Sequence, residues 1–407
     1  MNYMFKLAFK NVLRSKRRII LTFLIMSFGI AIYILMAGML KGFDDASIKN
    51  IIDFDTGHYK LRSIAFDEDR PFDTANYLDN VLDLKAKLSK LSFITGITER
   101  VNFLAELDNS IDASSVVCVG IGPQDNKVFS LAEYISEGEL QAEGVILGKN
   151  LAEGMGLKLG DMVYLTFRNK QGMLTSMERV ITGIVNSADP RVNNSSVFMP
   201  LAAAKQYLNT EQVTEIAVKT DSANQISKYE PEINKALEGL AKVYSWKKLS
   251  QDFVAITAMK KKSSSVFLLM ITIIAMVGII NTLLMSVYEK KREIGTMKAL
   301  GMTDKEVRTL FLMEGLLIGV AGGILGLILG TLFNGYFVIQ GLDITAMVGE
   351  ETKDIGYPVM GVVKSAWDYS AYIGALLLSV LASLLASYYP ARKVTKLQPM
   401  ECLRTIQ

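Results

Sequence analysis

Few residues of this sequence have the types and spacing that chemistry at a site requires. Gly144-Val-Ile-Leu-Gly148-Lys149-Asn150 is similar to a phosphate-binding loop, but its spacing is one residue short and Asn150 stands where Ser or Thr would hold Mg²⁺. The single histidine, His58, excludes a multi-histidine metal site and is expected to be an ordinary loop residue. Because no nucleophile, base and metal ligands occur together, we expect no catalytic residue, no metal site and no nucleotide site.

A short charged segment is more promising as a binding site. Tyr288-Glu-Lys-Lys-Arg-Glu-Ile-Gly-Thr-Met-Lys-Ala-Leu-Gly-Met302 lies between two apolar runs, so the simplest interpretation is a charged helix that joins two membrane spans. Such a helix has no lipid to cover and no core of its own. We therefore expect Ile294, Met297 and Leu300 to be exposed and to contact a protein partner.

The composition places the chain among polytopic membrane proteins. Half of its 407 residues are hydrophobic, the mean hydropathy is +0.27, and the apolar residues gather in four blocks. A net charge of +3 is too small to indicate nucleic acid as a partner. The expected fold class is an α-helical membrane protein with four transmembrane helices plus an α+β extracytoplasmic (periplasmic) domain between helices 1 and 2.

The four blocks and the segments between them divide the chain into nine parts. They are an amphipathic N-terminal helix (1–18), a first span (19–41), an α+β domain with stalk extensions (42–262), a second span (263–288), the charged helix (289–309), a third span (310–339), a short loop (340–368), a fourth span (369–389) and a tail (390–407). The first apolar run is long and lacks a small-x-small site behind it, so we interpret it as an uncleaved span.

The domain of residues 42–262 has strand and helix patterns that interleave. Val163-Tyr-Leu-Thr-Phe167 and Glu215-Ile-Ala-Val-Lys219 alternate like strands. Arg168-Asn-Lys-Gln-Gly172 is typical of a hairpin tip. Helical spacing occurs at Tyr77 to Leu91, Leu201 to Leu208 and Ile226 to Leu240.

The third span carries glycines at four-residue spacing, which let another helix approach backbone to backbone. Static packing and a sliding surface are both compatible with this ladder, which consists of Gly315, Gly319, Gly322, Gly323, Gly326 and Gly330. Two polar residues interrupt the apolar runs. Asn281 is expected to bond another helix, and Glu314 to lie at the headgroup level beside Arg308 or Lys305.

Lysine and arginine predict the orientation in the membrane. The segment 289–309 and the tail are rich in both, whereas residues 340–368 contain five acidic residues and only two lysines. The positive-inside bias therefore places both termini and the charged helix in the cytoplasm, and the large domain outside. Cys118 and Cys402 then lie on opposite sides of the membrane, and no intramolecular disulfide is expected.

Two motifs identify a family. Val277-Gly-Ile-Ile-Asn-Thr-Leu-Leu-Met-Ser-Val-Tyr-Glu-Lys-Lys-Arg-Glu-Ile-Gly-Thr-Met-Lys-Ala-Leu-Gly301 resembles the signature of the MacB/FtsX/LolC-LolE group of ABC-transporter permeases, and so does the segment from Tyr389 to Arg404. Residues 143–161, 180–187 and 197–208 look like the periplasmic domain of the lipoprotein-releasing members. Residues 53–104 are least like the family.

The resemblance implies a bacterial inner-membrane permease that pairs with an identical or homologous permease and with two copies of a cytoplasmic ABC ATPase. ATP and Mg²⁺ would be bound by the ATPase, and this chain would need no cofactor. In the family the helix after the second span docks into the ATPase. Carried over by position, the docking residues are Glu289, Lys290, Lys291, Arg292, Glu293, Ile294, Met297, Lys298, Leu300 and Met302.

In lipoprotein-releasing relatives an acylated lipoprotein enters between the outer ends of spans one and two and is handed to a periplasmic carrier. The matching candidates for an acyl-binding surface are Met36, Met39, Leu40, Phe43, Val266, Phe267, Met270 and Ile273. Ordinary contact with membrane lipid is the alternative at each position.

Lipoprotein extraction is therefore the leading hypothesis. A MacB-like mechanotransmission efflux permease and an FtsX-like regulator of a cell-wall hydrolase are the alternatives. The stretch that would match a carrier-binding hairpin, about Arg168 to Met177, is short and lacks proline. This departure favours the interpretation that the chain is either the permease of a heterodimer that does not bind the carrier, or one copy of a homodimer.

Overall fold

The computed structural model describes residues 2–14, 16–73, 76–141, 143–187, 189–223, 225–343 and 361–395. The described chain divides into two compact units, which we call the helical unit and the β-rich domain. The helical unit comprises residues 1–44, 256–342 and 363–407, and the β-rich domain comprises residues 45–255 and 343–362. Predictions that concern residues 396–407, Cys402 among them, and most of the loop 340–368 lie outside the described residues.

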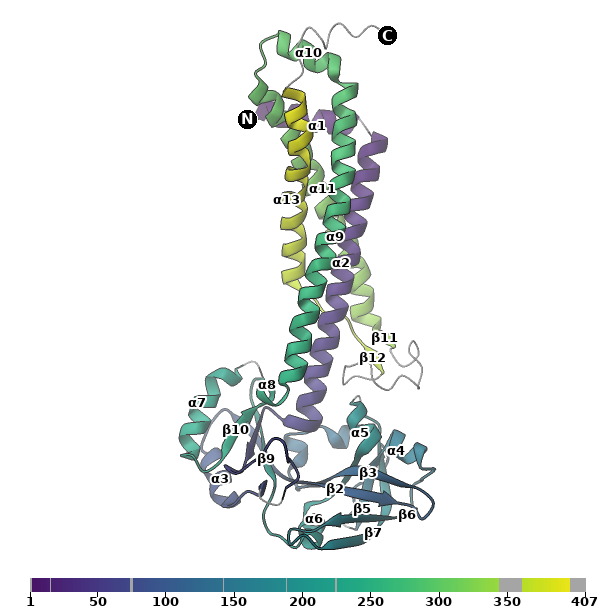
Figure 1. Ribbon diagram of the computed structural model, residues 1–407, viewed down its shortest axis with the longest axis vertical. Helices are drawn as coiled ribbons and strands as arrows, with labels where there is room; N and C mark the ends of the chain where they lie inside the picture. The colour runs from purple at the N-terminus through teal and green to yellow at the C-terminus, as the bar shows by residue number, and fades with distance from the viewer. Residues whose placement is uncertain are drawn as a thin grey trace. The chain divides into compact units, whose positions relative to one another are not determined.

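The helical unit contains four helices that are long and apolar enough to cross a membrane, with a mean hydropathy of 1.9 to 2.5 in their most apolar windows. They are α2 (Lys16–Asn50), α9 (Gln251–Glu289), α11 (Asp304–Gln340) and α13 (Tyr369–Thr395) (Figure 1). Two shorter helices accompany them, α1 (Asn2–Arg14) and α10 (Lys291–Ala299). α13 continues through Pro390 to Thr395, beyond the expected end of the fourth span.

The glycine ladder of α11 has two faces. On one face, Cβ atoms built at Gly315, Gly319 and Gly323 would come within 2.0 to 2.6 Å of side-chain atoms of Ser387, Ser383 and Ser379 in α13. On the other face, Gly322, Gly326 and Gly330 lie against Met26, Ile30 and Ile34 in α2. On both faces α11 lies close to a neighbouring helix, and a side chain at any of these positions would require that neighbour to shift.

The β-rich domain is built on one ten-stranded sheet in the order β10-β1-β9-β2-β3-β8-β5-β7-β4, with β6 pairing β2 and β7. The strands are β1 (Tyr59–Arg62), β2 (Ile94–Asp108), β3 (Ala113–Ile121), β4 (Ile135–Gly138), β5 (Gly144–Gly148), β6 (Met162–Arg168), β7 (Leu174–Val185), β8 (Ser196–Pro200), β9 (Glu215–Thr220) and β10 (Lys242–Ser245). The two predicted strands are β6 and β9. The hairpin prediction is also confirmed, because β6 and β7 pair antiparallel around Gly172, whose φ is 79°.

Helices cover this sheet at α3 (Val81–Leu88), α4 (Lys149–Gly154), α5 (Pro190–Ser195), α6 (Leu201–Leu208), α7 (Ile226–Leu237) and α8 (Trp246–Leu249). Three of them lie in the predicted helical stretches. α7 ends before the predicted Leu240 because Glu238 adopts a left-handed conformation, with φ 51°.

The strand β2 joins two lobes of the sheet. Its first half pairs with β9, from Ile94 to Arg100, and its second half pairs with β3, from Arg100 to Asp108. The change of partner occurs at Arg100, which is buried and bonds Asp125 through Nε and Nη2 at 2.8 and 2.7 Å.

A six-residue π-helix, η1 (Ile51–Thr56), continues α2 into this domain. Ile52 belongs to the main hydrophobic core, and Phe54 belongs to a second core cluster that includes Val119 and Phe198. Arg100 Nη1 donates to the carbonyl of Phe54 at 3.0 Å. η1 ends at Gly57, whose φ of 58° lies in the region that favours glycine.

Two sequence expectations in this domain need correction or a new explanation. His58 is buried rather than an ordinary loop residue, and its Nδ1 accepts from the backbone amide of Thr220 at 3.0 Å. The loop similar to a phosphate site is the end of β5 and the start of α4. A Cβ at Gly148 would lie 2.2 Å from the carbonyl oxygen of Val192, so close packing against α5 accounts for this glycine.

Candidate docking site

The short helix α10 lies between α9 and α11, and local sequence signals set both of its ends. α10 stops before Gly301, whose φ of 99° is a conformation that other residues rarely adopt. α11 then starts with a capping box, in which the Thr303 amide donates to Glu306 Oε2 at 2.8 Å and the Glu306 amide donates to Thr303 Oγ1 at 3.4 Å. The charged segment is therefore a separate helix only over residues 291–299. The predicted bounds 289–309 were too wide, because Glu289 ends α9 and residues 304–309 belong to α11.

One face of α10 is packed into the helical unit. Ile294 is 1% exposed and belongs to a small hydrophobic cluster with Val287, Val307, Phe311, Ala391 and Val394. The last two of these residues come from the end of α13. α10 is thus seated on α9, α11 and α13.

An ion pair and two hydrogen bonds lie around this seating. Lys298 Nζ lies 2.8 Å from Asp304 Oδ1 and donates to the carbonyl of Thr395 at 3.1 Å. Lys393 Nζ donates to Tyr288 Oη at 2.5 Å. The contacts of Lys298 connect α10 to the start of α11 and to the end of α13, and the bond of Lys393 connects α13 to α9.

A buried polar cluster lies beneath α10. Glu314 Oε1 accepts from Asn11 Nδ2 at 2.6 Å and lies 3.5 Å from Lys290 Nζ. Glu314 is 2% exposed and Lys290 is 8% exposed. The cluster therefore connects α1, the residue that precedes α10, and α11.

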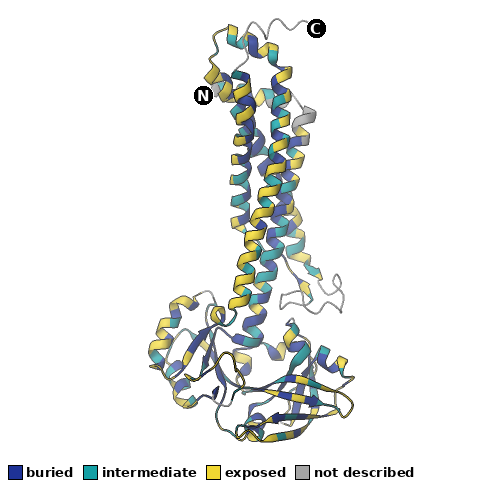
Figure 2. Ribbon diagram, in the orientation of Figure 1, coloured by how far each residue is buried: buried dark blue, intermediate teal, exposed yellow. Residues whose placement is uncertain are grey.

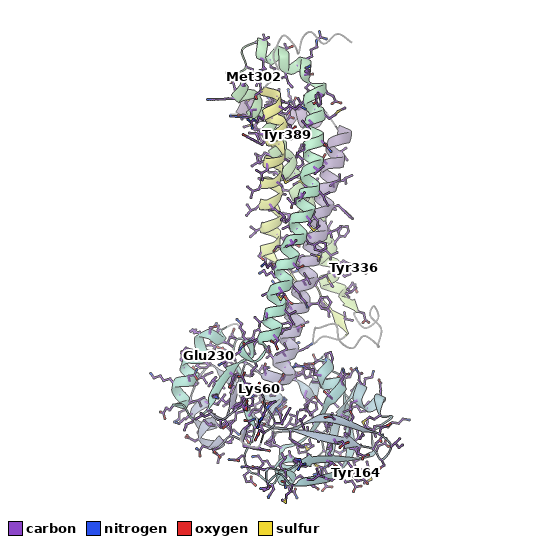
Figure 3. All side chains as sticks on the ribbon, in the orientation of Figure 1. Lys60, Tyr164, Glu230, Met302, Tyr336 and Tyr389 are labelled. Carbon is purple, nitrogen blue, oxygen red and sulfur yellow. The ribbon has the colours of Figure 1, made fainter. Side chains whose placement is uncertain are left out.

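The other face of α10 is exposed. Arg292, Glu293, Thr296 and Leu300 are exposed at three- and four-residue spacing, and 83% of Leu300 is accessible. Met302, which follows α10 in the chain, is labelled in Figure 3. A charged stripe with one large apolar residue can bind a protein groove through ion pairs and a single apolar contact.

The structure corrects part of the predicted docking set. Ile294 and Lys290 are buried in this chain and cannot contact a partner directly, while Lys291, Met297, Lys298 and Met302 are half-buried. Arg292, Glu293 and Leu300 remain on the open face, and Glu289 is exposed at the end of α9.

The expected partners of Glu314 were also wrong. Lys305 and Arg308 are exposed on α11, and the carboxylate instead contacts Asn11 and Lys290. The reason is that α1 packs on α11, with Ala8 fully buried, and covers the position that sequence reasoning left at the membrane surface.

Among the residues that the structure describes, the expected hydrogen bond of Asn281 to another helix is not seen. Asn281 is exposed on α9, whereas the next residue, Thr282, shares a hydrogen bond of 2.6 Å with Thr22 of α2. Sequence reasoning also missed Asn334 of α11. It is buried, and its Nδ2 donates to the carbonyl of Ala366 at 3.2 Å. Its polar side chain in an apolar run was the available signal.

The candidate acyl-binding residues fall into two groups. Val266, Phe267, Met270 and Ile273 are exposed on α9, whereas Met36, Met39, Leu40 and Phe43 on α2 are half-buried. Of the four long helices, α9 is the least covered, with 17% of its most apolar window buried against 33 to 44% in the others (Figure 2). Among the four long helices that the structure describes, the apolar window of α9 is therefore the most exposed.

Comparisons with known proteins match both parts of the chain. A family model described as the MacB-like periplasmic core domain matches residues 19–236, and the FtsX-like permease C-terminal model matches residues 265–399.

Curated relatives are similar over most of the chain. The lipoprotein-releasing system transmembrane protein LolE of Haemophilus influenzae is 24% identical over 79% of this chain and 80% of its own length. LolC of the same organism is 22% identical, with coverages of 83% and 82%. The macrolide export ATP-binding/permease protein MacB of Haemophilus ducreyi is 24% identical over 58% of this chain and 32% of its own length.

Among solved structures, the extracellular domain of YknZ is 15% identical, with a TM-score of 0.33, and covers 46% of this chain and 100% of that domain. The periplasmic region of MacB from Actinobacillus actinomycetemcomitans is 17% identical, with a TM-score of 0.36, 51% of this chain and 96% of that region.

Proposed function

We propose that this chain, which belongs to the family of ABC-transporter permeases with a MacB-like periplasmic core domain and an FtsX-like permease domain, extracts lipoproteins from a bacterial inner membrane. A separate cytoplasmic ATPase supplies the energy. Both termini and α10 lie in the cytoplasm, and the β-rich domain lies outside. A second permease, identical or homologous, completes the complex.

The exposed face of α10 is the observation that carries the mechanical part of this proposal. Arg292, Glu293 and Leu300 form a protein-binding stripe on a helix whose other face is seated on three membrane helices. A displacement of α10 is therefore passed to α9, α11 and α13 together.

Lipoprotein as the cargo is supported by the likeness to LolE and LolC, which extends over about four-fifths of the chain. The uncovered apolar face of α9 also suits an acyl chain, because Phe267 and Met270 offer a broad and adaptable apolar surface. A periplasmic carrier would receive the lipoprotein. The likeness to MacB favours efflux of another periplasmic substrate as the second candidate.

One experiment separates these candidates. The chain is reconstituted in lipid with its ATPase, and ATP hydrolysis is measured with an acylated lipoprotein and with the same protein lacking its acyl chains. We expect only the acylated form to stimulate hydrolysis and to leave the membrane in the presence of a carrier. An equal response to both forms would refute lipoprotein extraction.

The docking assignment has a separate test. Arg292→Glu combined with Leu300→Asp changes the exposed stripe without touching the buried Ile294, so the ATPase should no longer copurify with the detergent-solubilised permease. Lys262→Glu, an exposed reversal near the other end of α9, is the matched control and should retain the ATPase. Wild-type ATPase stoichiometry in the double variant would contradict the assignment.

A further inference from the structure

The N-terminal helix α1 is held against the helical unit by one face. It packs on α11, and Ala8 is fully buried. Asn11 Nδ2 donates to Glu314 Oε1 of α11 at 2.6 Å. Figure 1 shows α1 lying across the helical unit, near the end that carries α10. This face is occupied by the chain itself, so a ligand of α1 has to bind the opposite face.

The opposite face carries two stripes of exposed side chains. Phe5 and Phe9 are each 49% exposed and form an aromatic stripe, because residues four apart are neighbours on a helix. Lys6 and Lys10 are also exposed and form a cationic stripe, about 100° further round the helix. An apolar stripe beside a cationic stripe is typical of a helix that lies in the interface of a membrane.

The chain keeps this open face of α1 at the membrane surface. Only one residue separates the end of α1 from the start of α2, which is one of the four helices able to cross a membrane. The apolar run of α2 begins at Ile19, so α1 ends within a few residues of the hydrocarbon region. Lipid headgroups are therefore the surface that the open face meets first.

The charge of the N-terminal segment selects among lipids. Residues 1–18 contain no acidic residue and six basic ones, namely Lys6, Lys10, Arg14, Lys16, Arg17 and Arg18. Clusters of about four to eight basic residues beside a membrane span attract anionic headgroups. A zwitterionic headgroup has no net charge, so the same cluster attracts it much less.

We propose that the open face of α1 is a binding site for anionic phospholipid. The lipid phosphates lie at Lys6 and Lys10, and the first part of the acyl chains packs against Phe5 and Phe9. The opposite face of α1 belongs to the buried polar cluster beneath α10, so the bound lipid lies one helix away from the candidate docking site.

The test uses the full-length chain alone in vesicles, so its result depends neither on the ATPase nor on the cargo. Phe9→Trp is the reporter, in a background without the two natural tryptophans (Trp246→Phe and Trp367→Phe). The vesicles contain phosphatidylcholine and phosphatidylglycerol in equal amounts, with bromine on the acyl chains of one lipid at a time. We expect brominated phosphatidylglycerol to quench the fluorescence at least about threefold more than brominated phosphatidylcholine, because the lysines concentrate the anionic lipid at α1.

Charge variants locate the site. Lys6→Gln combined with Lys10→Gln should reduce this difference at least about twofold, whereas Lys6→Arg combined with Lys10→Arg should retain it, since the charge is kept. Lys228→Gln combined with Lys235→Gln makes the same change of charge at exposed positions of α7 in the β-rich domain and should have no effect.

Thermal unfolding in detergent shows whether each variant is folded. Phe5→Trp, at an equally exposed position, replaces the reporter if Phe9→Trp is not. Equal quenching by the two brominated lipids, or quenching by neither, would overturn the proposal and leave the open face to a protein partner such as the ATPase. An unchanged difference in the double glutamine variant would also overturn it, because the attraction would then come from elsewhere in the chain.

Discussion

Glu314 illustrates how one side chain can connect three segments. It accepts a hydrogen bond from Asn11 and lies beside Lys290, and both members of the ion pair are nearly inaccessible. Since a buried charge that loses its partner is strongly destabilising, each of these residues depends on the other.

We expect Glu314→Gln and Lys290→Met each to lower the free energy of unfolding by about 3–5 kcal/mol, because either change leaves a buried group unpaired. The double variant should lose much less than the sum of the two. Chemical denaturation in detergent measures all three, with Glu289→Gln at an exposed position as control. Additive losses would show that the two residues are not coupled.

His58 is the second residue whose environment has a measurable consequence. Burial, aided by the charge of Lys219, lowers the pKa of His58 from 6.5 to about 4. The neutral ring is the form whose Nδ1 can accept from the Thr220 amide. In the unfolded chain the imidazole takes up its proton near pH 6.5, whereas in the folded domain it does so only near pH 4.

The free energy of unfolding of the β-rich domain should therefore lose about 1.4 kcal/mol per pH unit from this residue as the pH falls from about 6.5 to about 4. Above pH 6.5 the imidazole is neutral in both the folded and the unfolded chain, so His58 causes no loss of stability there. His58→Gln should remove it and make the pH dependence shallower. Fluorescence of Trp246, which is buried beside His58, reports unfolding in a Trp367→Phe background. Parallel curves for the two proteins would contradict the assignment.

At the scale of elements, the glycines of α11 determine how closely the helices approach. Gly319→Ala would place a methyl group 2.0 Å from Ser383 Oγ and 3.1 Å from the carbonyl oxygen of Ser379. We expect a loss of about 1–3 kcal/mol in stability from this overpacking.

Gly374→Ala in α13 is the matched control, because its Cβ would meet nothing within 4 Å. This change should be neutral or slightly stabilising, since alanine is the better helix former. Thermal unfolding of the two variants in one detergent gives the comparison. An equal effect of the two substitutions would mean that the close contact at Gly319 does not limit the packing.

The elements show what sequence reasoning could and could not predict. The spans and the glycine ladder follow from composition and spacing, which are local. The burial of Ile294 was missed because it depends on Ala391 and Val394, which lie far along the chain. Asn281 and Thr282 are neighbours, but successive helical residues point about 100° apart. Only the packing of α9 on α2 decides that Thr282 faces the other helix.

At the scale of the whole molecule, two helices belong to both units. The boundary between the units falls after Asp44, within α2, and after Ala255, within α9. Under the proposed function, motion that begins at α10 is passed along these two helices, and α2 is followed directly by η1.

Ala46→Pro should interrupt this path, because proline inside a helix removes one hydrogen bond and clashes with the preceding turn. We expect ATP hydrolysis by the assembled complex to persist while release of cargo falls to background. Asp252→Pro, in the first turn of α9 where proline is tolerated, is the control and should release cargo normally. Normal release by Ala46→Pro would mean that continuity of α2 is not required.

The contact between α11 and α13 has a consequence for the axial offset of the two helices. Small residues recur every fourth position on α13, at Ala371, Ala375, Ser379, Ser383, Ser387 and Ala391, and all of them are buried. The three serine hydroxyls donate mainly to carbonyls of their own helix. A displacement by four residues, about 6 Å at 1.5 Å per residue, would again bring small residues opposite Gly315 and Gly319. The repeat therefore allows close packing at more than one offset, and the hydrogen bond from Asn334 of α11 to the carbonyl of Ala366, just before α13, selects one of them.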